Sequence, residues 1–237
     1  KAFYGCEKLN GPLEFPDSTA EIGTSAFYKC SGFSGDLTFG RQIKTIEKEA
    51  FRETGFTGKL FFPDYLYNSD NNVLTIKERA FYGCDGFTST LSLPQNTKFE
   101  GKEIFRGCSE FKGDLIIPEG STFDSAATDT FRDCSSFTTL NIKSDKVTKI
   151  NDGTFQGCTN LKGTIPFENI KTIGKNAFSG CSSLSGPLHL SATEIQEYAF
   201  CNCQGFTELI CEKPLEKVYK YAFYGCSGLT GTLDCTS

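Results

Sequence analysis

The stretch SGCSSLSGPLHL, residues 179–190, recurs in nearly the same form elsewhere in this chain of 237 residues. Close copies are YGCEKLNGPLEF at 4–15, QGCTNLKGTIPF at 156–167 and YGCSGLTGTLDC at 224–235. Each copy places a Gly-Cys pair ahead of an apolar residue, a second glycine and a short apolar segment. Because self-similarity at a regular spacing is the signature of repeat architectures, these copies predict a tandem repeat.

Ten phenylalanines mark the repeat along the whole sequence. They follow one another at intervals of 22 to 30 residues, in the column Phe3, Phe27, Phe51, Phe81, Phe105, Phe131, Phe155, Phe178, Phe200 and Phe223. Nine of the ten have a cysteine three positions later, and the third unit has Thr54 there. A strand-like alternation such as Leu188-His-Leu190 then follows. We therefore expect about ten coils of 22–26 residues, the third carrying an insertion.

A single coil cannot be stable alone. Ordering its backbone costs roughly 1–2 kcal/mol per residue, while each of its few inward side chains returns only about 1.5–3 kcal/mol. Stacking of coils makes up the difference, with phenylalanine packed on phenylalanine and parallel strands side by side. We expect residues 1–237 to form one solenoid domain. Since no polar capping coil is recognisable at either end, we also expect it to be a fragment of a longer array.

The repeat resembles the BspA-like, or Treponema pallidum-type, leucine-rich repeats. The segments that carry the resemblance are IGTSAFYKCSGF at 22–33, IKERAFYGCDGF at 76–87 and IGKNAFSGCSSL at 173–184. The resemblance implies an α/β leucine-rich-repeat solenoid, a strand-rich horseshoe or arc. It would have a parallel sheet on one face and short strands or 3-10 turns on the other. It also implies an extracellular or cell-surface location and a role in adhesion and protein–protein contact.

Most units depart from that family pattern by one extra residue ahead of the strand. The residue is usually glycine, as in Gly186, and is serine in the unit with Ser89. Two units, CSSFTTLNI and CQGFTELIC, lack it. An isolated glycine at such a place indicates a bulge or a tight bend before the strand.

The twelve cysteines are interpreted as packing residues rather than as a disulfide framework. Nine occupy the inward column Cys6, Cys30, Cys84, Cys108, Cys134, Cys158, Cys181, Cys203 and Cys226, where most are expected to be free thiols. Cys201 directly follows a column phenylalanine and is expected to be exposed, as a reactive thiol or an intermolecular bridge. No C-x-x-C motif occurs, so no metal site is predicted.

Composition excludes several classes of function. The net charge is −5 and no Lys/Arg stripe is present, which argues against a nucleic-acid partner. No apolar run approaches the length of a membrane span. The single histidine, His189, alternates outward between two leucines, and no catalytic set or cofactor motif is recognisable. We therefore expect neither an enzyme nor a bound cofactor.

The remaining candidate for function is the outward side of the strands. In a solenoid these positions lie side by side, and here they are Glu14, Thr38, Phe61, Ser92, Ile116, Asn141, Pro166, His189, Ile210 and Asp234. Phe61, Ile116 and Ile210 are apolar where solvent is expected and could anchor a partner. A second exposed column, Tyr4, Tyr28, Tyr82 and Tyr224, lies on the opposite rim, where plain stacking along the array is an equally ordinary role.

The sequence thus favours a non-enzymatic extracellular scaffold that binds a protein or a glycan, of host or matrix origin, through its strand face. The alternative is a structural subunit that self-associates through the ends of the solenoid, or through Cys201, into a fibre or surface layer.

Overall fold

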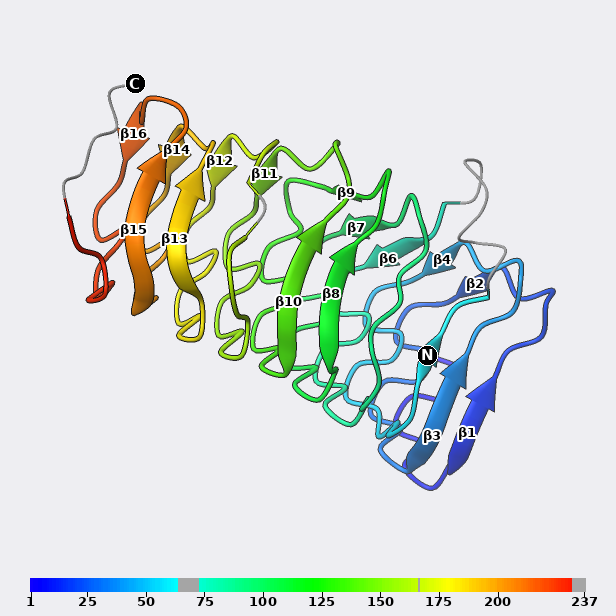
Figure 1. The fold of residues 1–237 in the computed structure, drawn as a ribbon. Coiled ribbons are helices and arrows are strands. Elements are labelled where there is room, and N and C mark those ends of the chain that lie inside the picture. The colour runs from blue at the N-terminus through cyan, green and yellow to red at the C-terminus, as the bar shows by residue number, and fades with distance from the viewer. Residues whose placement is uncertain (64–72, 166, 232–237) are drawn as a thin grey trace.

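The computed structural model describes residues 1–63, 73–165 and 167–231, which wind into an elongated solenoid (Figure 1). The longer strands lie on one side: β1 (Gly11–Glu14), β3 (Phe33–Thr38), β5 (Leu60–Phe61), β8 (Gly113–Ile117), β10 (Phe137–Ile142), β13 (Ser185–Leu190) and β15 (Gly205–Cys211). Short strands form the other side: β2 (Glu21–Ile22), β4 (Thr45–Ile46), β6 (Thr75–Lys77), β7 (Lys98–Glu100), β9 (Thr122–Phe123), β11 (Lys149–Ile150), β12 (Thr172–Ile173), β14 (Glu194–Ile195) and β16 (Lys217–Val218).

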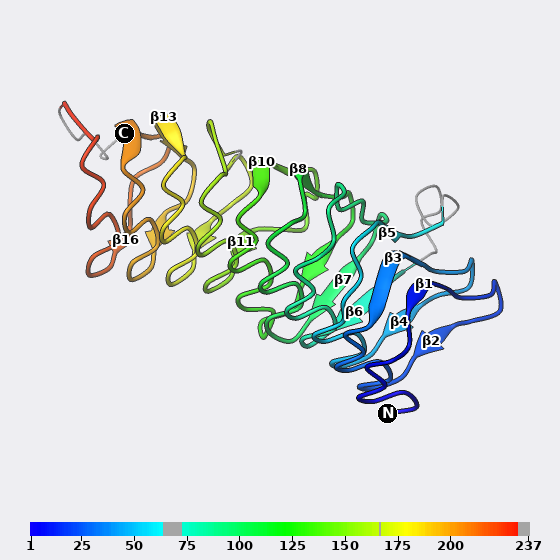
Figure 2. The same ribbon diagram turned by 90° about the horizontal axis from the view of Figure 1, so that it is seen from below.

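Every strand pair in these ranges is parallel, as successive coils of one solenoid require. The short strands form two sheets, β2-β4-β6-β7-β9 and β11-β12-β14-β16. The longer strands form three smaller sheets, β1-β3-β5, β8-β10 and β13-β15, which stand in a row along the array (Figures 1 and 2). We call this row the long-strand face.

The core is built on the predicted phenylalanine column. Each of the ten rings stacks on the next, with centroids 5.1–5.9 Å apart. Rings in such offset stacks gain contact energy beyond the area they bury. Ten stacked rings bound nine complete turns, one fewer than the roughly ten coils predicted.

The expected bulges are confirmed too. The register shifts between Gly11 and Leu13, between Phe137 and Thr139, and between Gly186 and Pro187. The glycine ahead of the strand has a positive φ of 74–91° in six units, at Gly11, Gly35, Gly113, Gly163, Gly186 and Gly231. A side chain is poorly tolerated there, which explains the glycine in the repeat.

The α part of the expected α/β class is not confirmed, because the described ranges contain no helix. Hydrogen-bonded turns connect the two sides instead, as where the Cys30 N–H donates to the Phe27 carbonyl at 3.1 Å. Two left-handed residues flank each such turn, for example Ser25 at φ 52° and Lys29 at φ 59°. A right-handed helix cannot continue through residues in that conformation.

The cysteine column does more than fill space. In eight successive contacts the thiol lies 2.9–3.1 Å from the phenylalanine carbonyl of the preceding coil and donates to it, from Cys30 on Phe3 to Cys226 on Phe200. In the third coil Thr54 donates to Phe51 of its own coil and meets the Cys84 sulfur at 3.3 Å. The column thiols are free, as predicted, whereas Cys211 at the end of β15 is disulfide-bonded.

Candidate binding surface

The structure places most of the predicted outward row on the long-strand face. Glu14 pairs with Thr38 and Thr38 with Phe61 in β1-β3-β5. Ile116 pairs with Asn141 and His189 with Ile210 in the two other sheets. Ser92 is exposed but lies outside any strand. Pro166 and Asp234 lie outside the described residues, so their predicted positions remain predictions.

The long-strand face is interrupted on either side of the β8-β10 sheet. Residues 88–93 keep a strand's alternation, with Leu91 and Leu93 buried, yet form no ladder with β5 or β8. Separate hydrogen bonds join this segment to its neighbours: the Thr88 N–H donates to Gly58, the Thr88 hydroxyl to the Thr57 carbonyl at 3.0 Å, and the Lys112 N–H to Ser89. At the second interruption an isolated bridge joins Gly163 to Leu184. Grooves occur at both interruptions.

The larger groove, about 730 Å³, lies between β5 and segment 88–92, which belongs to no strand. Its lining combines apolar, hydroxyl and basic side chains: Lys59, Leu60, Phe61, Phe62, Thr88, Ser89, Thr90, Ser92 and Lys112. This volume falls within the range of ordinary ligand sites. We call it the Phe61 groove.

The exposure of Phe61 is not explained by a position at an end of the solenoid. Eight large hydrophobic residues within the described ranges are exposed, and seven of them lie on the first or the last coil. Phe61 is the exception, 44% exposed on an inner coil. Ile116 and Ile210, the other predicted anchors, are half-buried, so the structure singles out Phe61.

Both lysines of the Phe61 groove have free ammonium groups as far as the described residues go. Lys59 and Lys112 are exposed and form no ion pair there. The nearby carboxylate of Asp36 accepts from the Lys59 backbone N–H at 2.7 Å, and that of Asp114 accepts from Thr139 at 2.6 Å. Among the residues that the structure describes, no carboxylate lines the groove itself.

The second interruption holds a smaller and acidic groove of about 360 Å³. It contains His189 with Glu168, Glu212 and Ser191. The Ser191 hydroxyl donates to Glu212 at 2.6 Å, and His189 Nδ1 lies 3.5 Å from the other oxygen of that carboxylate. A serine nucleophile needs the histidine as its base, and here the carboxylate stands between them. These residues therefore do not form a catalytic triad.

The predicted tyrosine column is part of a ladder in which arginines alternate with tyrosines. Tyr4 packs edge-on against Tyr28 at 4.9 Å, and the Arg52 guanidinium lies 5.1 Å from the Tyr28 ring and 4.8 Å from the Tyr82 ring. Tyr28 and Tyr82 are only half exposed. Stacking along the array accounts for these residues.

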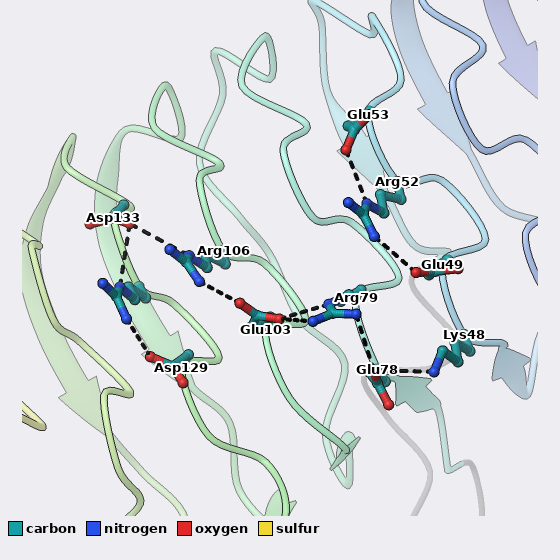
Figure 3. Close-up of polar contacts among 11 residues, drawn as sticks. Lys48, Glu49, Arg52, Glu53, Glu78, Arg79, Glu103, Arg106, Asp129 and Asp133 are labelled. Carbon is teal, nitrogen blue, oxygen red and sulfur yellow. Dashed lines mark hydrogen bonds and ion pairs between the residues drawn. The ribbon is translucent and has the colours of Figure 1, made fainter. Parts of the chain in front are cut away.

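Ion pairs extend this ladder across four coils (Figure 3). Glu103 accepts hydrogen bonds from Arg79, at 2.6 and 2.7 Å, and from Arg106. Arg106 also lies 3.7 Å from Asp133. Burial acts to raise the pKa of the Glu103 carboxyl, but the hydrogen bonds from the two arginines outweigh it and hold that pKa below its ordinary value. The arginine charges are thus engaged within the protein, so this rim is a poor candidate for binding.

The prediction of an exposed thiol at Cys201 is wrong, because Cys201 is buried with 9% of its surface exposed. Most coils carry Tyr, Arg or Gln at this position. Those side chains are long enough to extend outward, whereas the short cysteine stays level with the backbone of its neighbours. Cys6 of the first coil is the exposed thiol among the described cysteines.

Sequence reasoning found Phe61 but missed the groove and its lysines. The signal was Ser89, which replaces the glycine ahead of the strand and is not in the left-handed region. We expect that the missing bend turns residues 90–93 away from the direction that pairing with β8 requires.

Comparisons with known proteins agree with this architecture. A family model described as BspA type leucine rich repeat region, in six copies, matches residues 1–74, 66–185 and 187–234. A leucine-rich repeat protein of T. pallidum superposes with a TM-score of 0.57 at 20% identity, over 73% of this chain and 77% of that one. A leucine-rich cell surface protein of Faecalibacterium prausnitzii gives a TM-score of 0.46 at 18% identity, over 98% of this chain and 66% of that one. No curated relative matches, and within the described ranges no helix has the length and apolarity that a membrane crossing needs.

Proposed function

Because the chain belongs to the BspA-type leucine-rich-repeat family, we propose that it is a non-enzymatic scaffold that binds a protein partner through its long-strand face. The exposure of Phe61 carries this proposal. An apolar side chain that is exposed on an inner coil and lines a groove has the character of an interface anchor. Thr38 lies beside Phe61 in the sheet and gives it a polar neighbour.

The chemistry of the side chains supports a binding role over a catalytic one. The column thiols are poor nucleophiles, because burial raises the pKa of Cys84 and Cys226 to about 11 and that of Cys108 well above its ordinary value. The lone histidine faces a carboxylate that already accepts from Ser191.

We place this scaffold outside the cell or on its surface. The placement rests on the family resemblance, and the disulfide at Cys211 is consistent with an oxidising compartment. Detection of the intact protein on unpermeabilised cells by antibody labelling tests the placement, and labelling only after permeabilisation would contradict it.

The binding role is tested with the purified chain and a panel of purified extracellular-matrix and plasma proteins, measured by biolayer interferometry. Phe61→Ser should weaken any saturable interaction about tenfold, because 1.4 kcal/mol corresponds to that factor. Tyr219→Ser, which changes an exposed aromatic on the last coil, is the matched control and should leave the affinity unchanged. An affinity that F61S leaves unchanged, or the absence of binding to every panel protein, would contradict the proposal.

Self-association is the second candidate, favoured by the seven exposed hydrophobic residues on the two end coils. Buried Cys201 no longer provides a route to it. Negative-stain imaging of the chain, with and without reductant, separates the two roles. Long filaments under both conditions would establish end-to-end stacking, whereas discrete short arcs favour the scaffold.

A further inference from the structure

The Phe61 groove differs in charge from the rest of the protein. The chain carries a net charge of −5, yet among the described residues the charged side chains that line this groove are two lysines, Lys59 and Lys112, and no carboxylate. The groove at the second interruption has the opposite character, with Glu168 and Glu212. The long-strand face is therefore polarised, with a basic groove at one interruption and an acidic one at the other.

The shape of the Phe61 groove suits an extended chain. One wall is the segment Lys59–Phe62, which includes β5, and the other is the segment 88–92, which lies outside any strand. These walls run side by side for about four residues, which corresponds to roughly 13 Å of extended backbone. A peptide lying along this slot would meet hydroxyl groups of Thr88, Ser89 and Thr90 on one wall.

We propose that the Phe61 groove binds an extended acidic peptide segment of a partner protein, which rests on and deepens the binding role proposed above. An aliphatic or aromatic side chain of the peptide packs on the Phe61 ring. Acidic side chains on either side of it pair with the ammonium groups of Lys59 and Lys112. Because neither lysine has an ion-pair partner in the described structure, pairing with the peptide costs no internal salt bridge.

In the described structure the two flanking carboxylates form no ion pair with these lysines. Asp36 is held by the Lys59 backbone N–H and Asp114 by the Thr139 hydroxyl. The arginines of the opposite rim, in contrast, are paired with Glu103, Asp129 and Asp133. Available positive charge and an exposed aromatic ring therefore coincide at this groove.

The test selects phage-displayed random octapeptides on the immobilised chain and then titrates fluorescein-labelled consensus peptides by anisotropy. We expect enrichment of Asp and Glu around one apolar residue, with affinity that falls as NaCl rises. The charge-reversed double variant K59E/K112E should weaken binding by about tenfold or more. K102E/K171E, which reverses two exposed lysines on the short-strand side, is the matched control and should change binding less than twofold.

Each other outcome overturns the inference in a distinguishable way. Selection of peptides that are not acidic, or that bind K59E/K112E with unchanged affinity, would refute the acidic-peptide inference. If those same peptides no longer bind F61S, the scaffold role proposed above would still stand. Binding of heparin or polygalacturonate through the two lysines, with no peptide enriched, would assign the groove to an acidic glycan instead. No enriched peptide together with no panel protein bound refutes both proposals. All four exchanged lysines are exposed, so the variants should fold normally. Their thermal unfolding midpoints, which should be unchanged, check this.

Discussion

Two neighbouring coils of the long-strand face follow the same repeat pattern and have different outer structures. The coil with Gly113 forms β8 and pairs over five residues with β10. The coil with Ser89 in the equivalent place has the same alternation of buried leucines and forms no ladder. Beneath them Phe87 and Phe111 stack without interruption at 5.2 Å. The core and the surface ladder are thus set by different residues, and the surface can open where the core is continuous.

The largest expected effect concerns the core that both coils share. Phe87→Ala and Phe111→Ala should each lower the free energy of unfolding by about 3–5 kcal/mol, because both rings are fully buried. Urea denaturation measures this. If Phe87→Ala alone lowers the free energy of unfolding by less than about 1 kcal/mol, the interruption reaches into the core. That result would contradict the claim that the core is continuous beneath both coils.

The thiol column also runs beneath both coils and makes stability depend on alkaline pH. Burial raises the pKa of Cys84 from 9.0 to about 11, so the folded state retains a proton that the unfolded state loses. This contribution is complete below pH 9 and disappears as pH rises from 9 to 11, which amounts to roughly 2–3 kcal/mol at 1.36 kcal/mol per pKa unit.

Urea midpoints in reductant at pH 8 and pH 10.5 test this dependence. Cys84→Ala is the control, since lysines and tyrosines titrate in the same range. The variant should lose part of the alkaline destabilisation, and an unchanged pH dependence would contradict the assignment to Cys84.

Exchanging glycine and serine at positions 113 and 89 should interconvert the outer structures of the two coils. Gly113→Ser places a side chain at φ 76° and should cost about 1–3 kcal/mol. It should also raise amide exchange across β8. Gly107→Ser, at a left-handed turn position with φ 76° and with the nearest atom 3.7 Å from an added Cβ, is a control that should carry a similar backbone cost without opening β8.

The reverse exchange has the smallest expected effect. Ser89→Gly permits the bend ahead of the strand and should stabilise the chain by about 1 kcal/mol, as ladder hydrogen bonds of about 0.5–1.5 kcal/mol each outweigh the glycine entropy. Amide exchange of Thr90 and Leu91 should slow. If these amides are already as protected as those of β8, the interruption is absent in solution.

Much of this architecture follows from the sequence, and the failures have specific physical causes. The phenylalanine column, the outward row and the glycine bulges could be predicted because each position repeats ten or nearly ten times. The absence of helix was not predicted, since left-handed residues such as Lys29 and Glu53 look like ordinary helix formers in sequence. Cys201 was misplaced because exposure at its position depends on side-chain length.

The groove could not be predicted from the repeat, since it results from departures from the repeat. Ser89 changes the backbone direction of one coil, and only the folded chain shows that Lys59 and Lys112 then share a groove with Phe61. The sequence shows where a coil departs from the repeat, but it does not show the geometry of the groove that results.

The most direct test of the account is an amide-exchange footprint of the chain with its selected partner bound. The account predicts slower exchange confined to residues 59–62, 88–92 and 112, with β2, β4 and the last coil unchanged. Protection on the short-strand side or at the ends of the solenoid, with the Phe61 groove unaffected, would contradict it.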